Sequence, residues 1–483
     1  MQIANPVNVL ERLRREPSEA EWLEFKTSAV APEDVGEYVS ALANGAMLAD
    51  RDYAFLILGV ENETHNIVGT TIRLKNWKVK GENFENWLNR LVEPRLNIEL
   101  IDFECEEKKL AMIIIEPSYH RPVSFSNVEY IRVGENKKKL KEFPERERSL
   151  WLATSRRKFE QAVARSGITP EEIPNLLNCK IAYSLRELLL PDNQDEVIKY
   201  LLSEGFIYDS YDGTYSITNL GAILLANDIT KFPSVAQKRV RIIRYSGSNK
   251  MASDLEQEGV RGYAQGFSGI IKFIIDNTPK KETYVGGVRK IVHDYPEVAI
   301  REIVANALIH QDFTIDGTGP TIEIYSDRIE VINPGQSLIE LDRILDERRS
   351  RNVKLAFMMR QLNLCEERGG GLDKALIAIE LQNSPAPTFY SSKDSMKVVI
   401  FSPKPFSELS KQDKERAGFF HCVLKWIQQD YMSNASLRRR FSLQDNDYQA
   451  VSAVISSLVK SGRIKPADPN QGNRSAKYIP YWA

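Results

Sequence analysis

The strongest constraint on the fold is that apolar, strand-like runs alternate with amphipathic helical segments in two separate stretches of the chain. In residues 8–140 the strand-like runs YAFLILGV and LAMIIIEP alternate with the helical segments VGEYVSALANGAML and ENFENWLNRLVEP. In the second stretch the helical segment EVAIREIVANALIHQDF is followed by the strand-like runs TIEIYS and RIEVIN. Because 483 residues are too many for one hydrophobic core, the pattern predicts an α/β multidomain chain.

Polar segments suggest where the parts of the chain meet. The charged run KKKLKEFPERERS is interpreted as the exit from the first α/β stretch and SELSKQDKERAG as a later linker. Between them, DEVIKYLLSEGFIYDSYDGTYSITNLGAILLA predicts a helix, a hairpin around Asp212–Gly213 and a second helix. We expect four parts: an α/β domain at 1–145, a helical or winged connecting module at 146–235, a second α/β unit at 236–405 and a winged helix at 410–483.

Composition limits the kinds of partner. No stretch approaches the roughly 20 uninterrupted apolar residues of a membrane span, so no membrane partner is expected. The start of the chain, MQIANPVNVLERLRREPSEAEW, has no apolar signal core, which predicts a cytoplasmic location. The four cysteines are far apart and form no CxxC pair, which favours reduced, structural thiols. Because the net charge is only -1, any contact with nucleic acid must come from local basic patches.

The segment SEAEWLEFK near the N-terminus holds the first candidate site. On a strand, Glu24 and Lys26 share one face, and Glu61 follows the buried strand YAFLILGV. SEAEWLEFK, the helix with Ala43-Asn44, the step LGVEN and the run RPV…YIRVGENKKK together resemble the Schlafen AlbA-type domain over roughly residues 10–142.

That resemblance leaves two functions open. Some Schlafen proteins are metal-dependent ribonucleases with three carboxylates, and the matching positions here are Glu19, Glu24 and Glu61, with Lys26 beside the scissile phosphate. Such carboxylates would hold Mg²⁺ or Mn²⁺ and activate water. Bacterial relatives are described as DNA-binding domains instead. In that case Glu19 and Glu21 are solvated residues at a strand edge, and Glu24 and Lys26 form a surface ion pair that contributes little.

A second candidate site lies in the second α/β stretch. Glu302 and Asn306 fall one turn apart on the predicted helix, where a magnesium-nucleotide site needs an amide oxygen for the metal and a carboxylate for water. Asn333 and Gly335 follow a strand. A glycine run precedes the helix LDKALIAI and could bring backbone N–H groups against phosphates: Gly369, Gly370 and Gly371.

The ordered motifs REIVANALIHQDF, IEIYSDRIEVINPG, RN and ERGGGLDKAL resemble the C-terminal ATP-binding domain of RecG-related proteins, a divergent branch of the GHKL ATPases, over residues 240–405. The resemblance implies ATP with Mg²⁺, Glu302 as general base, Asn306 as metal ligand, Asn333 as adenine-reading residue and a glycine phosphate loop. GHKL enzymes usually carry Asp where this chain has Asn333. A helicase is not expected, because the chain has no GxxxxGK[ST] loop.

The C-terminal segment predicts a winged helix with a basic surface. Its last long helix, DYQAVSAVISSLVKSG, has a core face formed by Val451, Val454, Ile455 and Leu458. The candidate phosphate contacts lie on the preceding helix and on the wing: Arg438, Arg439, Arg440, Lys465, Arg474 and Lys477. A protein-docking wing is the alternative, and His310 and His421 are expected to be structural.

These observations favour an ATP-responsive regulator that binds nucleic acid, DNA or RNA, and acts as a dimer or higher homo-oligomer. An ATP-gated, Schlafen-like nuclease acting in antiviral defence is the rival function. A non-catalytic scaffold is the third.

Overall fold

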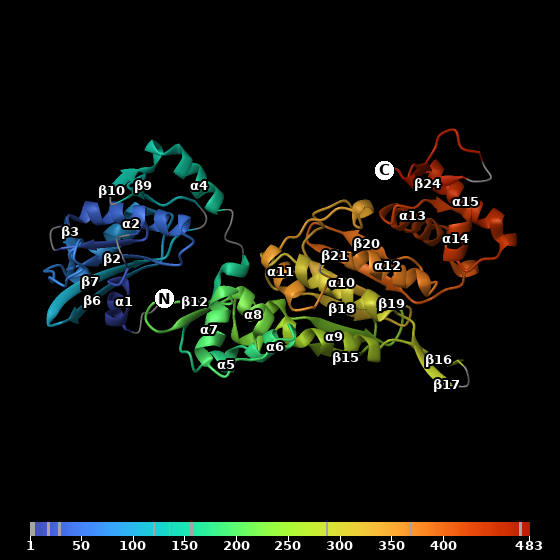
Figure 1. Ribbon diagram of the computed structural model, residues 1–483, viewed down its shortest axis with the longest axis horizontal. Helices are drawn as coiled ribbons and strands as arrows, with labels where there is room; N and C mark the ends of the chain where they lie inside the picture. The colour runs from blue at the N-terminus through green and yellow to red at the C-terminus, as the bar shows by residue number, and fades with distance from the viewer. Residues whose placement is uncertain are drawn as a thin grey trace. The chain divides into compact units, whose positions relative to one another are not determined.

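The computed structural model describes residues 5–16, 20–27, 30–118, 121–134, 136–154, 159–285, 288–366, 370–472 and 476–483. The chain forms two compact units. One comprises Met1–Ile173 and Asn193–Gly221, and the other Pro174–Asp192 and Ala222–Ala483. Helices and several separate sheets occur in both units (Figure 1), so the predicted α/β multidomain architecture is confirmed.

The first unit is built on a four-stranded sheet of order β1-β2-β7-β6. Strand β2 is fully buried, as expected for the apolar run AFLIL. Its neighbour β1 is parallel to it, and helix α2 supplies the crossover connection that parallel strands require. The elements are α1 (Pro6–Leu13), β1 (Leu23–Lys26), α2 (Pro32–Leu48), β2 (Ala54–Leu58), β6 (Ile98–Cys105) and β7 (Lys108–Ile115).

A second sheet, of order β10-β9-β8-β5, packs on helix α2. The buried amide of Asn44 joins the two, because its Nδ2 donates to the carbonyls of Val123 and Tyr130 while its Oδ1 accepts from the Val123 N–H. The remaining elements here are β3 (Lys78–Val79), β4 (Glu82–Asn83), α3 (Phe84–Leu91), β5 (Val92–Glu93), β8 (Ser124–Phe125), β9 (Val128–Val133) and β10 (Asn136–Lys139).

The charged run that was interpreted as the exit from the first α/β stretch has regular secondary structure. It forms strand β10, a short 3-10 turn and helix α4 (Pro144–Thr154). Leu140 in this run, together with Leu150 and Ala153 on α4, forms a small buried cluster with Met47 and Ile131. The few apolar residues between the charged ones are therefore the residues that pack in this cluster.

The hairpin predicted around Asp212–Gly213 belongs to a three-stranded sheet of order β11-β13-β12 in the first unit. Thr214 donates to the Asp212 carboxylate and Gly213 has φ +92°, which is the left-handed conformation that a tight turn needs. The elements are β11 (Val163–Ile168), α7 (Gln194–Ser203), β12 (Ile207–Asp209) and β13 (Tyr215–Thr218), with α5 (Ile173–Leu176), α6 (Cys179–Ser184) and α8 (Asn219–Leu225) nearby in sequence.

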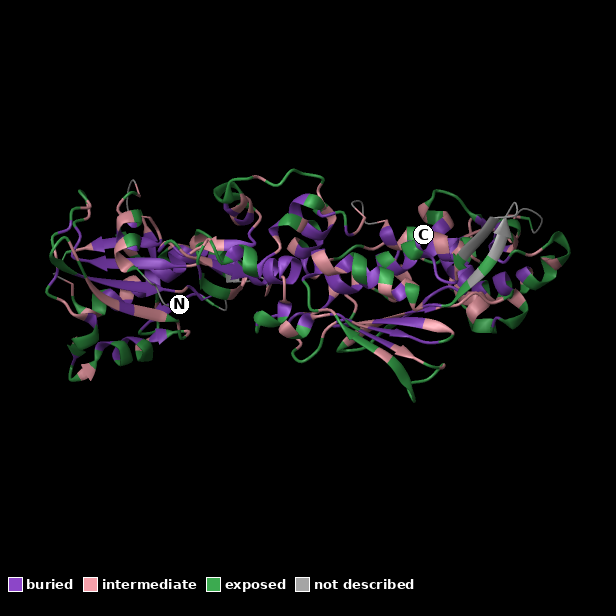
Figure 2. Cartoon of the chain, turned by 90° about the horizontal axis from the view of Figure 1, so that it is seen from below, coloured by how far each residue is buried: buried purple, intermediate pink, exposed green. Residues whose placement is uncertain are grey.

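The second unit contains a six-stranded sheet of order β15-β14-β18-β19-β21-β20. Side chains such as Ile322, Ile324 and Val331 are buried on the face that helices α9, α10 and α12 cover. Figure 2 shows that both the strands and the helices of this unit carry buried segments. The elements are β14 (Arg241–Tyr245), β15 (Ser253–Glu258), α9 (Tyr263–Asp276), α10 (Glu297–His310), β18 (Thr321–Ile324), β19 (Arg328–Pro334), α11 (Val353–Gln361), α12 (Gly371–Leu381), β20 (Thr388–Ser391) and β21 (Ser395–Phe401). A hairpin of β16 (Lys280–Val285) and β17 (Val288–His293) lies between α9 and α10 in sequence.

The C-terminal segment has the order helix, strand, two helices and a two-stranded wing. Most of the expected polar linker is helical, because Ser410 and Asp413 form a capping box that begins α13 at Lys411. The predicted core face of the last helix is confirmed, since Val451, Val454, Ile455 and Leu458 are buried. The elements are α13 (Lys411–Ile427), β22 (Met432–Ser433), α14 (Asn434–Arg440), α15 (Tyr448–Lys460), β23 (Ile464–Pro466) and β24 (Lys477–Pro480).

None of the described helices combines the length and the apolar character needed to cross a lipid bilayer.

Candidate functional site

A cavity of about 340 Å³ opens in the second unit between helices α10 and α12, strand β19 and the segment that precedes α11. Four of the residues chosen from sequence line it: Glu302, Asn306, Asn333 and Gly371. They come from three separate elements, so the fold brings together residues up to 69 positions apart (371 − 302).

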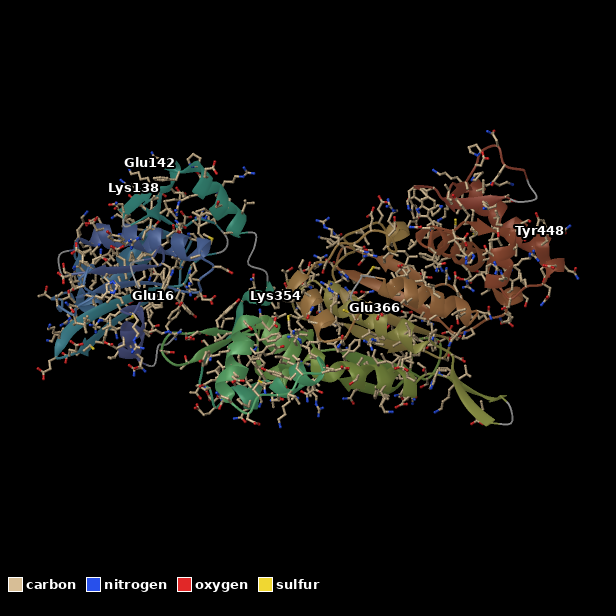
Figure 3. All side chains as sticks on the ribbon, in the orientation of Figure 1. Glu16, Lys138, Glu142, Lys354, Glu366 and Tyr448 are labelled. Carbon is tan, nitrogen blue, oxygen red and sulfur yellow. The ribbon has the colours of Figure 1, made fainter. Side chains whose placement is uncertain are left out.

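Glu302 and Asn306 reach the cavity from one face of α10, as the helical spacing predicted. Glu302 is 5% exposed, and burial raises the pKa of its carboxyl, while Arg301 opposes that shift. The backbone N–H of Glu366, labelled in Figure 3, donates to this carboxylate. Among the described residues, none is hydrogen-bonded to the Asn306 side chain, so its amide remains available to a ligand.

Helix α12 begins against Glu302. A Cβ on Gly371 would stand 2.0 Å from Glu302 Oε2, so only glycine allows this approach. Gly370 is the N-cap residue of α12, and no side chain caps the helix. Gly370 does not line the cavity, and Gly369 lies outside the described residues.

Asn333 lies on the helix-facing side of β19 and is 4% exposed. Its Nδ2 donates to the neighbouring carbonyl of Pro334 at 3.2 Å. This leaves Oδ1 as the atom that could accept from a ligand, as an adenine amino group would require.

Gly335 has a different role from the cofactor contact assigned to it. It does not line the cavity, and its φ of +97° together with a Cβ position 2.7 Å from Asp312 Cβ explains why glycine is needed. Asp312 in turn pairs with Arg351 at 2.8 Å. Gly335 therefore allows the loop after α10 to pack closely against the end of β19.

The sequence interpretation missed the basic side of the cavity. Arg348, Arg349 and Arg360 line it, and all three precede the glycine loop in the chain. The run DERRSRN was the available signal, but only its last two residues were used. The end of α10 is fixed by Asn352, whose Nδ2 donates to the carbonyls of Ile309 and Gln311 at 2.8 Å each.

The cavity also has an apolar wall, which suits an aromatic base, made of Leu338, Ile339, Phe389, Met396 and Val398. His310 lines the cavity too, and burial lowers its pKa to about 4, so the imidazole is neutral near pH 7. The groups that line the cavity fit a magnesium nucleotide. Asn306 offers an amide oxygen and Glu302 a carboxylate, and the three lining arginines could neutralise the charge of phosphate groups.

In the N-terminal domain Glu24 is fully buried and forms ion pairs with both Arg132 and Lys26. Arg132 is also fully buried and donates to the Leu23 carbonyl at 2.9 Å. A metal ion at Glu24 would have to displace two cations. In the alternative interpretation Glu24 and Lys26 form a surface ion pair, whereas in the structure the Glu24 side chain is fully buried and only Lys26 is partly exposed.

Glu61 lies in an exposed turn after β2, where its carboxylate accepts from Thr64 at 2.5 Å. His65 belongs to the same turn, and its ring packs on the ring of Phe25. Phe25 and Glu24 are consecutive on β1, so their side chains point to opposite faces of the sheet. Within the described residues, the one group of three potential metal ligands close enough to share an ion is Glu11, Cys105 and Glu106, which includes neither predicted acid. Glu19 lies outside the described residues, so the complete triad stays a prediction.

The C-terminal arginines differ in accessibility. Arg440 is buried, donates to the Ser384 carbonyl at 2.7 Å and pairs with Glu380 at 3.4 Å. Burial lowers its pKa. A phosphate contact by Arg440 is excluded in this conformation, because α14 packs this residue against the α12 side.

Arg438 pairs with Asp445 and donates to Asn434, whereas Arg439 is exposed. Lys465 and Lys477 are exposed on the wing strands. Arg474 lies outside the described residues. His421 is buried between Glu380 and Ser436, in agreement with a structural role.

Comparison with known families agrees with both resemblances. Residues 19–141 match the family "Schlafen, AlbA_2". Residues 317–400 match the family described as "Putative ATP-dependent DNA helicase recG C-terminal". The chain thus contains a Schlafen AlbA_2 domain and a RecG-related, ATPase-like domain, as the motifs predicted.

The solved structures that are similar to the chain include the following two. The DIP2311 protein from Corynebacterium diphtheriae is 15% identical, with 98% of this chain and 96% of that chain covered and a TM-score of 0.44. The N-terminal domain of a "Putative ATP-dependent DNA Helicase RecG-related Protein" from Nitrosomonas europaea is 20% identical, with 29% and 93% covered and a TM-score of 0.18. No curated protein matches the chain.

Proposed function

We propose that this protein is an ATP-binding regulator that engages nucleic acid under the control of its nucleotide state. The observation that carries the proposal is the cavity itself, because Glu302, Asn306, Asn333 and Gly371 meet there although they were chosen from separate sequence motifs.

The cavity suggests a role for each group. Asn306 offers an amide oxygen to Mg²⁺, Asn333 Oδ1 accepts from the base edge, and the N-terminus of α12 at Gly371 faces the phosphates. Arg348, Arg349 and Arg360 supply positive charge that the glycine loop lacks. Glu302 is the candidate base for slow hydrolysis, since burial raises the pKa of its carboxyl toward the working pH.

Nucleic-acid binding is supported by two parts of the chain. The Schlafen-type match covers the first, and the second is the C-terminal helix-strand-helix-helix-wing segment, which exposes Arg439, Lys465 and Lys477. With a net charge of -1, such local groups must provide the attraction to phosphate. The nuclease alternative lacks comparable support, because both oxygens of Glu24 face cations.

Calorimetry with MgATP on the full chain tests the nucleotide site. We expect Asn306→Ala to weaken binding at least tenfold, about 1.4 kcal/mol, because a metal ligand is lost. Asn8→Ala, an exposed helical asparagine on α1, is the matched control and should bind MgATP as the wild type does. Equal affinity in both variants would overturn the assignment.

Fluorescence anisotropy with labelled DNA and RNA, with and without MgATP, tests the control of nucleic-acid binding. The proposal requires that MgATP change the affinity for nucleic acid, and by linkage that nucleic acid change the affinity for MgATP by the same factor. Light scattering on the same samples measures the predicted dimer.

A further inference from the structure

The tip of the β12–β13 hairpin packs onto the N-terminal domain within the first unit, and its contacts resemble those of a nucleotide. Asp209 receives two parallel hydrogen bonds from the guanidinium of Arg12, Nη1 to Oδ1 and Nη2 to Oδ2, each 2.7 Å long. A phosphate is recognised by arginine in the same forked geometry.

Tyr211 adds an aromatic ring beside that carboxylate. The Arg12 guanidinium lies 4.9 Å from the ring centroid, and the Trp22 ring lies 6.0 Å away at 39°. Arg51 donates to the Tyr211 hydroxyl at 2.9 Å and also lies over Trp22 at 4.9 Å. A nucleobase placed where this ring lies would contact the same arginine and indole faces.

The backbone at the tip is strained. Tyr211 has φ +68°, a left-handed conformation that a bulky residue rarely adopts. The conformation places the ring on Trp22 and Phe55. Strain at such a turn persists only where the contacts of the turn hold it in place.

We propose that Arg12, Arg51 and Trp22 form a binding site for one nucleotide of a single-stranded nucleic acid, and that Asp209 and Tyr211 cover this site in the present conformation. This inference rests on the proposed function, because it names the surface through which the N-terminal domain engages nucleic acid. The hairpin tip competes with the ligand, its carboxylate occupying the phosphate position and its ring the base position.

The exposure of the site allows this exchange. The side chains of Arg12 and Asp209 are 46% and 24% exposed, so water and ligand reach the ion pair, and an ion pair open to solvent is weak. Arg15, three residues after Arg12 and just beyond the end of α1, is exposed and forms no ion pair within the described part of the chain. It is placed to contact a neighbouring phosphate.

Two substitutions should release the tip without unfolding the hairpin. Asp209→Asn keeps an acceptor for the Tyr211 N–H, which now donates to Asp209 Oδ1 at 2.8 Å, but removes the charge that Arg12 pairs with. Tyr211→Gly removes the ring and adopts the positive φ freely. Glu196→Gln, an exposed acid on α7 of the same module, is the control for loss of one negative charge.

The test is fluorescence anisotropy of the full chain with labelled oligo-dT and oligo-U of about 12 nucleotides, a length within the usual site sizes of single-strand-binding modules. The double variant, which carries both Asp209→Asn and Tyr211→Gly, should bind about tenfold more tightly than the wild type. In the wild type the hairpin tip covers the site and so reduces the apparent affinity for the oligonucleotide. Glu196→Gln should bind like the wild type. The two oligonucleotides distinguish DNA from RNA.

Adding Arg12→Ala to the released double variant should remove the gain. The inference is overturned if the released chain binds no better than the wild type, or if its gain persists without Arg12. Circular dichroism and thermal unfolding verify that each variant is folded. If neither the wild type nor the released double variant binds the oligonucleotides, with or without MgATP, the proposed function fails as well. If oligonucleotide binding depends on MgATP but is the same in the wild type and the hairpin variants, only this inference is overturned.

Discussion

Glu302 Oε2 lies 2.0 Å from the position that a Cβ of residue 371 would occupy, so the carboxylate of α10 and the first turn of α12 share one space. This contact joins the candidate base to the candidate phosphate loop. Any side chain at 371 must push Glu302 away or shift α12.

Gly371→Ala should therefore weaken MgATP binding and lower stability by about 1–3 kcal/mol, the cost of forcing a methyl group into a packed site. Calorimetry and chemical denaturation measure the two effects. Gly269→Ala is the matched control, since it lies on α9 with no atom near the added methyl and should leave stability unchanged or slightly raised. If the two variants behave alike, the close approach has no consequence.

Glu302→Gln should change how stability depends on pH. Burial raises the folded-state pKa of this carboxyl, so the folded protein holds the proton more tightly than the unfolded chain. The stability that this group contributes is present below its unfolded pKa and is lost as pH rises through the folded value. The variant should thus gain stability relative to the wild type as pH rises from acid to neutral. A difference in unfolding free energy that does not vary with pH would contradict the assignment.

Glu24→Gln should mainly affect folding. Removing the charge leaves Arg132 buried opposite a neutral amide, which should cost about 3 kcal/mol or more. Glu61→Gln, on an exposed turn, should cost little. Chemical denaturation compares them. If Glu24→Gln is as stable as the wild type but loses a metal-dependent cleavage activity, the nuclease alternative is favoured instead.

Arg439 and Arg440 are neighbours that should have opposite phenotypes. Arg439→Ala should weaken nucleic-acid binding and reduce the salt slope by about one, since an exposed phosphate contact is lost. Arg440→Ala should lower the melting temperature without changing that slope in the folded protein, because Arg440 contacts Ser384 and Glu380. Anisotropy titrations at several salt concentrations separate the two. An unchanged slope for Arg439→Ala would favour a protein-docking wing.

The local sequence was sufficient for features that depend on near neighbours. Glu302 and Asn306 reach one cavity because helical periodicity places positions four apart on the same face. The turn at Asp212–Gly213 followed from its residue types, and the buried face of α15 from the spacing of its apolar residues. Each of these is fixed within a few residues of chain.

Only the tertiary structure decided which charged groups are free to act. Glu24 meets Arg132 across 108 positions, and Tyr211 meets Arg51 across 160. Arg440 is buried while Arg439 is exposed, although both belong to one arginine run. A charged side chain can be buried only where the fold supplies a partner for its charge. That partner can lie far away in the sequence, so the local pattern does not specify whether the side chain is buried and paired or exposed.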